Sequence, residues 1–271
     1  MNVWEALILG IVQGITEFLP VSSSGHLVLL QKIFGISEPA LLFDTALHGG
    51  TMLAVIVILR RDILGILRRI VQPMTAFLII ATIPLVIAAL LLKDIIEEAF
   101  RSASFLGLAF LVTSALLFIS GGKNQSRSQT EMTWKDALVI GLFQAIAVFP
   151  GVSRSGSAIS GALSRKLNRD FAARFSFLLS IPAILGALVL QIKELTELSS
   201  QTAASALPSS GTEIALLPLI AGTAAATVVA FFSVKLAIKI VREHNLYGFA
   251  LYTGILGFLI LADKFVLHIF F

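Results

Sequence analysis

Residues 6–25, ALILGIVQGITEFLPVSSSG, have a second version at residues 137–156, ALVIGLFQAIAVFPGVSRSG. With a constant offset of 131 positions the two stretches align without a gap. Four of the matched pairs are Gly10 with Gly141, Gln13 with Gln144, Ser22 with Ser153 and Ser24 with Ser155. The chain therefore contains an internal duplication, and each copy places a polar, Ser-rich break inside an apolar segment.

The composition identifies the environment of these breaks. Hydrophobic residues make up 57% of the 271 residues, charged residues only 13%, and the mean hydropathy is +0.94, as in integral membrane proteins. The chain has no cysteine, which excludes disulfides, thiolate metal sites and a cysteine nucleophile. The net charge of +4 does not indicate a nucleic-acid partner, because basic loops that face an anionic lipid leaflet also give a membrane protein a positive net charge. The first residues lack a basic n-region, so we expect no cleaved signal.

Apolar segments of about 20 residues are long enough to cross a bilayer. The sequence predicts six, near residues 41–59, 74–92, 102–119, 171–191, 214–238 and 246–263. Two further apolar regions, 3–34 and 134–165, are interrupted by LPVSSSGH and PGVSRSGS, which favours re-entrant helical hairpins. The predicted fold is an all-α polytopic membrane protein with two such hairpins and about six transmembrane helices. We expect a single membrane domain, 1–271, with repeat halves of about 1–125 and 126–271.

Lys and Arg predict the orientation. Basic residues cluster after the first span, after the third, before the fourth and between the last two, whereas the opposite loops are acidic. With the basic loops in the cytoplasm, the first hairpin dips in from outside and the second from inside. The halves then form an inverted-topology repeat, whose two breaks meet near the bilayer midplane. We further expect residues 198–212, LSSQTAASALPSSGT, to form a flexible external loop.

The two breaks predict an anion site. A helix restarts near Ser23 and another near Arg154, and each helix N-terminus presents unpaired N–H groups and the positive end of a dipole. Gly25, Gly151 and Gly156 allow the backbone to approach a ligand closely. Facing helix N-termini, serine hydroxyls and a guanidinium suit a phosphate or diphosphate.

These motifs, with FDTALHGGTMLAV, ATIPLVIAALLLKD and FSFLLSIPAILGA on later spans, resemble the undecaprenyl-diphosphate phosphatases linked to bacitracin resistance. The resemblance covers nearly the whole chain. It implies a bacterial inner-membrane enzyme, multi-pass and with its active site open to the outer side, that hydrolyses a C55 polyprenyl diphosphate to the monophosphate and so recycles the lipid carrier of cell-wall synthesis. It also implies a divalent cation, Mg²⁺ or Ca²⁺, and assigns catalysis to Glu17, Ser23, His26 and Arg154. Gln13 stands where many relatives have Glu, so this motif alone offers a metal one carboxylate, that of Glu17, and not two.

The remaining candidates each have two interpretations. Ser22, Ser24, Gly25, Ser153, Ser155 and Gly156 either hold the phosphates or cap the helices and pack the breaks. Asp44 and His48, spaced i to i+4 on the first span, either contribute with Glu17 and Gln13 to a cation site or pair with each other. Gly10, Gly14, Gly49 and Gly50 are expected to be close-packing positions.

The mechanism remains open between two schemes. In one, Ser23 attacks phosphorus with His26 as base, and in the other His26 is the nucleophile or the base for a water. A transporter or flippase for a phosphate or polyprenyl-phosphate anion is the alternative function, because secondary transporters share this predicted architecture. The oligomeric state also stays open, with a homodimer as one arrangement.

Overall fold

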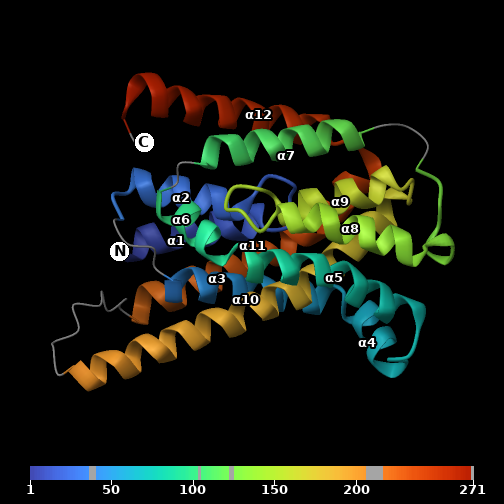
Figure 1. Cartoon of the computed structure of the whole chain (residues 1–271), viewed down its shortest axis with the longest axis horizontal. Helices are drawn as coiled ribbons and strands as arrows, with labels where there is room; N and C mark the ends of the chain where they lie inside the picture. Colours follow the sequence, from blue (N-terminus) through green and yellow to red (C-terminus); the bar gives the residue numbers. More distant parts are fainter. Residues whose placement is uncertain (37–40, 103–104, 122–124, 206–215, 270–271) are drawn as a thin grey trace.

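The computed structural model describes residues 1–36, 41–102, 105–121, 125–205 and 216–269, and over these ranges the chain is helical with no strand. The helices are α1 (Val3–Thr16), α2 (Ser23–Ile33), α3 (Leu41–Ile58), α4 (Arg60–Arg68), α5 (Pro73–Leu91), α6 (Lys93–Ser102), α7 (Leu106–Ser120), α8 (Trp134–Ile146), α9 (Arg154–Ser164), α10 (Arg169–Ser205), α11 (Leu216–Glu243) and α12 (Tyr247–Ala262). Short turns η1 (Gln129–Glu131) and η2 (Asp263–Leu267) complete the secondary structure of these ranges. The protein is thus an all-α bundle (Figure 1).

Within the described ranges, four helical segments are long and apolar enough to cross a membrane: α5, Arg169–Ile192 of α10, α11, and α12 with η2. A fifth is added if α3 and α4, which bend by 77° at their junction, count as one. The remaining predicted span, 102–119, coincides with α7, which has 15 residues. The protein is therefore a multi-pass membrane protein.

Two helices extend beyond their predicted ends. Helix α11 continues to Glu243, past the predicted end near residue 238, and carries Lys239 and Arg242 in its last turns, beside the turn to α12. Helix α10 continues to Ser205, so the first part of the predicted external loop, 198–205, is helical. Leu198, Gln201, Ala203 and Ala204 in this stretch are good helix formers, and their propensity extends the helix. The rest of the predicted loop, 206–212, lies outside the described residues.

The duplicated segment forms the same local structure twice. Helix α1 ends at Thr16 and α2 begins at Ser23, while α8 ends at Ile146 and α9 begins at Arg154, so both predicted restart points are confirmed. The N-caps are equivalent serines: Ser22 Oγ accepts from Gly25 N at 3.3 Å, and Ser153 Oγ accepts from Gly156 N at 3.0 Å. Figure 1 shows α1 and α2 toward one end of the bundle and α8 and α9 toward the other, with their loops near the middle.

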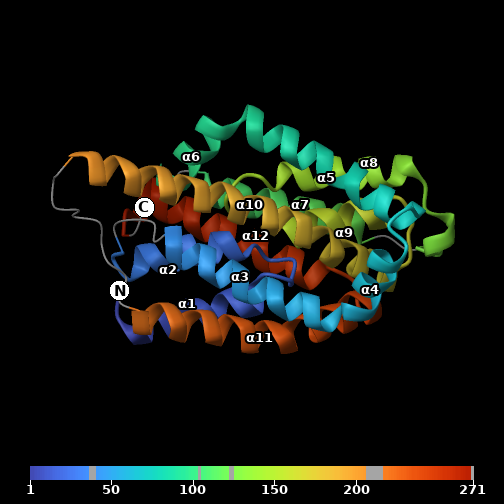
Figure 2. The ribbon, with the colours of Figure 1, turned by 90° about the horizontal axis from the view of Figure 1, so that it is seen from below.

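Each broken helix packs on a helix of the other half. Helix α1 lies along α11, as both views show, and α8 lies along α5 (Figures 1 and 2). The contact positions are repeat-related glycines: Gly10 meets the Gly222 backbone, and a Cβ on Gly141 would lie 2.5 Å from the Ala81 carbonyl oxygen. Because only glycine allows these approaches, the duplicated glycines fix both helix pairs.

Of the other three glycines predicted to be close-packing positions, two are confirmed and one is not. A Cβ on Gly14 would lie 2.7 Å from the Ala226 carbonyl oxygen, and one on Gly50 would lie 2.5 Å from Thr227 Oγ1, so both are close-packing positions. The prediction for Gly49 is wrong, since no atom lies within 4 Å of the place a Cβ would take.

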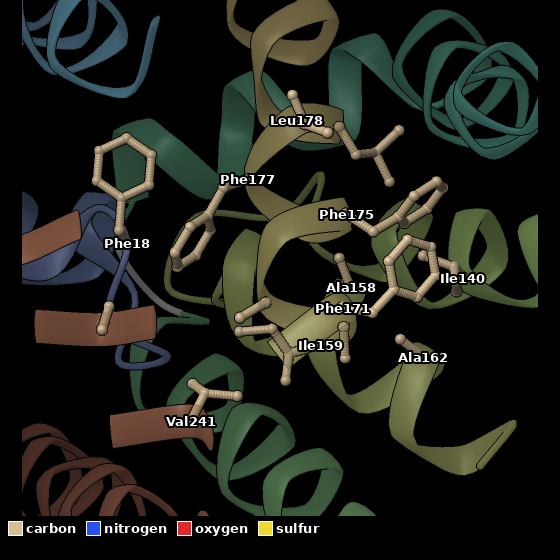
Figure 3. Close-up of a cluster of buried hydrophobic side chains, with 14 of the residues drawn as sticks. Phe18, Ile140, Ala158, Ile159, Ala162, Phe171, Phe175, Phe177, Leu178 and Val241 are labelled. Atoms are coloured by element: carbon tan, nitrogen blue, oxygen red, sulfur yellow. The ribbon is translucent and has the colours of Figure 1, made fainter. Parts of the chain in front are cut away.

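A core of aromatic and aliphatic side chains supports the first break (Figure 3). Phe18, in the loop after α1, is 1% exposed and makes an edge-to-face contact with Phe177 of α10, with ring centroids 5.3 Å apart. Such a contact adds about 1 kcal/mol to the burial of the rings. It anchors the loop directly beside Glu17.

A buried carboxylate holds the start of α8. Asp136 is fully buried and accepts from Arg127 Nη2 at 2.8 Å, from Arg165 Nε at 2.7 Å and from the Thr133 backbone N–H at 2.9 Å. Burial alone would raise the pKa of Asp136, but the hydrogen bonds from the two arginines and Thr133 outweigh it and hold the pKa well below its ordinary value. The loop before α8 and the end of α9 are thereby tied to one carboxylate.

Candidate active site

The two breaks enclose a small polar cavity. It is lined by Glu17, Ser22, Ser23, Ser24, Ala147, Val152, Ser153 and Arg154 and has a volume of about 20 Å³. The first four residues come from the first break and the others from the second, so the duplication brings its two copies face to face. A space of this size holds about one water molecule.

Glu17 and Ser23 form the shortest side-chain contact in the cavity. Ser23 Oγ donates to Glu17 Oε2 at 2.5 Å, and Gln13 Nε2 donates to the same oxygen at 2.9 Å. Both Glu17 and Ser23 are at most 9% exposed. A hydroxyl bonded to a buried carboxylate is arranged as a nucleophile beside its base.

His48 of α3 joins this cluster, and Asp44 does not. His48 Nδ1 lies 3.0 Å from Gln13 Nε2 and 3.4 Å from Glu17 Oε2. Because the amide nitrogen only donates, His48 Nδ1 accepts from it. Asp44 instead accepts from Gln31 Nε2 at 3.0 and 3.3 Å. Asp44 and His48, although one helical turn apart, therefore belong to two different hydrogen-bond networks. The described contacts include no Asp44–His48 pair.

Arg154 lines the cavity and carries an unused donor. Its side chain begins α9 beside the N-cap Ser153, and its Nη1 is buried with no hydrogen-bond partner among the residues that the structure describes. Nor do the described contacts include an ion pair between Arg154 and Glu17. A buried guanidinium N–H without a partner costs about 1–3 kcal/mol, which an anionic ligand would recover.

Hydrogen bonds join the two breaks at their edges. Ser155 Oγ donates to the Leu19 carbonyl oxygen at 3.0 Å, and Gly151 N donates to Ser24 Oγ at 3.3 Å. The second break is also held by Thr113 of α7, whose Oγ1 accepts from Ser153 N at 3.0 Å. These bonds satisfy irregular backbone that a bilayer would leave without partners.

The backbone at Ser22 is strained, and His26 holds it. Ser22 has φ of 70°, a region that non-glycine residues seldom adopt. His26 Nδ1 lies 2.6 Å from the Ser22 carbonyl oxygen, and His26 Nε2 lies 2.6 Å from Tyr252 Oη of α12. The imidazole is thus engaged on both sides, and the described contacts give it no hydrogen bond to Ser23.

Several predicted site residues do not line the cavity. Gly156 contributes only a capping N–H, Ser155 bonds Leu19, and Gly25 packs against Phe110 and Gly151. Gln13, His26 and His48 form the layer behind the lining, and Asp44 lies in its separate pair with Gln31. Sequence reasoning missed Thr113 and Tyr252, which sit in apolar helices without a motif.

One side-chain oxygen of Gln13 and one of Glu17 suit a divalent cation. Gln13 Oε1 is buried without a partner among the described residues, and the described side chains bond Glu17 through Oε2, leaving Oε1 unused. Carboxylate and amide oxygens are ligands that Mg²⁺ and Ca²⁺ accept. Within the described part of the chain no three His, Asp or Glu side chains cluster as a metal cage. The residues therefore offer two oxygen ligands to such a cation and would leave its other positions to ligands from outside the chain.

Known proteins resemble the chain along almost all of its length. Undecaprenyl-diphosphatase of Carboxydothermus hydrogenoformans is 45% identical over 263 residues, covering 97% of each chain. Undecaprenyl-diphosphatase 4 of Bacillus thuringiensis is 41% identical over 266 residues, covering 98% of each. The undecaprenyl-diphosphatase of Methanosphaera stadtmanae is 39% identical, covering 98% of this chain and all of that protein. The family model for bacitracin resistance protein BacA matches residues 6–259. The chain therefore belongs to the BacA family of bacitracin resistance proteins.

Proposed function

We propose that the protein hydrolyses undecaprenyl diphosphate to undecaprenyl phosphate and inorganic phosphate, recycling the lipid carrier of cell-wall synthesis and so giving bacitracin resistance. The observation that carries this proposal is that Arg154, whose Nη1 is buried without a partner among the described residues, lines the same small cavity as the Ser23–Glu17 pair. One side of the cavity offers a donor for phosphate oxygen, and the other offers a hydroxyl with its base.

The geometry supports Ser23 as the nucleophile and Glu17 as its base. Ser23 Oγ attacks the terminal phosphorus, its proton passes to Glu17 Oε2, and the bond from phosphorus to the undecaprenyl phosphate oxygen breaks. A water then attacks the phosphorus of the phosphoserine and the bond from phosphorus to Ser23 Oγ breaks. Ser23 Oγ takes back its proton from Glu17, and inorganic phosphate leaves with the oxygen and the protons of the water. His26 lies behind this pair and bonds to the Ser22 carbonyl oxygen. Of the two schemes that the sequence leaves open, the geometry therefore favours attack by Ser23. The base in this scheme is Glu17 and not His26.

Arg154 and the amide groups that begin α9 bind the phosphate oxygens on which negative charge collects in the transition state. A divalent cation, Mg²⁺ or Ca²⁺, would be held by Glu17 Oε1 and Gln13 Oε1. When bound it would supply charge neutralisation on the diphosphate.

In the membrane, we propose that the two broken helix pairs are re-entrant hairpins of an inverted repeat. The opposite placement of α1–α2 and α8–α9 in the bundle supports this arrangement (Figure 1). With the basic residues around α4 and before α10 in the cytoplasm, the site of this inner-membrane enzyme opens to the outer side.

The experiment is phosphate release from undecaprenyl diphosphate by the purified protein in detergent, with EDTA and with Mg²⁺ or Ca²⁺ restored. We expect release that EDTA abolishes and the cation restores, and release that Ser23→Ala abolishes. Ser164→Ala is the matched control, because Ser164 Oγ donates only to the Gly161 carbonyl oxygen of its own helix, away from the cavity. Absence of release with each cation would leave a transporter of the lipid phosphate as the function. Full activity of Ser23→Ala would refute serine attack.

A further inference from the structure

Tyr252 contacts His26, in the layer of residues behind the cavity lining, and has no role in the mechanism above. It lies on α12, 226 residues after His26, and is 46% exposed on the side of the bundle. Its hydroxyl nevertheless turns inward and lies 2.6 Å from His26 Nε2. A tyrosine hydroxyl at membrane depth needs a partner inside the protein, and His26 is that partner.

The hydrogen bonds around His26 define its tautomer. The Ser22 carbonyl only accepts, so His26 Nδ1 carries a proton and donates to it at 2.6 Å. In the neutral imidazole Nε2 then has no proton, and it accepts the Tyr252 O–H. Tyr252 therefore stabilises the one tautomer that bonds to Ser22.

Ring contacts fix the orientation of the same imidazole. The Tyr252 and His26 rings are nearly parallel, at 9° with centroids 5.7 Å apart, and Phe110 meets His26 edge-on at 86° and 5.4 Å. Phe110 is fully buried, so it cannot move aside to let the ring turn.

The chain of contacts leads to the nucleophile. The carbonyl that His26 holds belongs to Ser22, whose φ of 70° is strained and persists only if its surroundings hold it. Ser22 precedes Ser23, whose hydroxyl must stay within 2.5 Å of Glu17. We propose that Tyr252 is a positioning residue: through His26 it holds the strained Ser22 backbone and thereby keeps Ser23 aligned with Glu17. This role rests on the proposed phosphatase function.

The variant Tyr252→Phe keeps the ring and removes only the hydroxyl. We expect kcat to fall about tenfold, equivalent to about 1.4 kcal/mol, with KM unchanged within twofold, because substrate binding stays and alignment is lost. Tyr247→Phe is the matched control, since Tyr247 is the other tyrosine of the chain and packs against Phe118 and Gly121, away from His26. We expect Tyr247→Phe to keep full activity. An unchanged kcat in Tyr252→Phe would overturn the proposal, as would an equal loss in both variants.

A spectroscopic measurement tests the positioning without substrate or turnover. Nitrogen-15 NMR of the histidine-labelled wild type, in mildly alkaline buffer, reports which ring nitrogen carries the proton, and His26→Asn assigns the signal among the four histidines. We expect a protonated Nδ1 and a bare Nε2 for His26, and a shift of the Nε2 signal in Tyr252→Phe but not in Tyr247→Phe. A wild-type His26 with its proton on Nε2 would refute the positioning role. If the wild type releases no phosphate, the proposed function fails while this result still decides the Tyr252–His26 link.

Discussion

Arg154→Lys separates a substrate-binding arginine from a structural one. Lysine keeps the positive charge but lacks the planar fork, so it loses the Nη1 donor, which has no partner among the described residues. A hydrogen bond to a charged group contributes about 1.5–3 kcal/mol. Loss of about 2.7 kcal/mol of transition-state stabilisation lowers kcat/KM about 100-fold.

The same structure predicts that stability does not fall with activity. Arg154 Nη1 has no partner among the described residues, so neither Arg154→Lys nor Arg154→Gln breaks a bond at that atom. We expect both variants to melt within about 3 °C of the wild type or above it, the range that about 1 kcal/mol produces in a chain of this size.

The assay is phosphate release from undecaprenyl diphosphate at varied substrate concentration, alongside thermal unfolding in the same detergent. Arg174→Lys is the matched control: Arg174 pairs with Asp62 and Asp170 away from the cavity, and its replacement should leave the kinetics unchanged. An Arg154→Lys protein with wild-type kinetics would refute the substrate-binding role. A large drop in melting temperature for both Arg154 variants would show instead that the arginine ties the two breaks together.

Three further predictions follow from other contacts. Glu17→Gln should lower kcat on the order of 1000-fold with normal expression, as for loss of a general base, and near-wild-type release would make the carboxylate structural. Gly10→Ala should destabilise the protein by about 1–3 kcal/mol in thermal unfolding because its Cβ meets the α11 backbone, whereas Gly49→Ala should not; equal effects would contradict the packing argument. Because the folded pKa of Asp136 lies below the unfolded value of about 4, the wild type should lose stability as pH falls below about 5. Asp136→Asn should lose about 2 kcal/mol at neutral pH and flatten this acid dependence, and an unchanged pH profile would contradict the buried pair.

Local signals in the sequence predicted the parts of the site that depend on local structure. The restarts at Ser23 and Arg154 follow from serine caps three residues before a glycine N–H, an interaction within one turn of helix. The repeat then implied that the two breaks lie together, and the cavity between them confirms that they do.

Partnerships between distant helices were not predictable in the same way. The spacing of Asp44 and His48 allowed a pair, but α3 faces Gln31 with one residue and Gln13 with the other, and only the packed bundle decides this. Tyr252 shows no pattern in its apolar helix, since its role depends on a contact 226 positions away. Helices α4 and α6 went unpredicted because each has only 9 or 10 residues and carries several charges, so neither resembles a span.

The exchange of packing partners between the halves also bears on how such a chain arose. Gly10 of the first half is covered by α11 of the second, and Gly141 of the second half is covered by α5 of the first. In a half-length ancestor, the glycine face of the broken helix would have had no helix to cover it. In the present chain the covering helix of each half packs on the broken helix of the other half: α5 packs on α8, and α11 packs on α1. Such an ancestor would have needed a second molecule of itself to complete the bundle. Gene duplication and fusion would then have joined two subunits that already depended on each other.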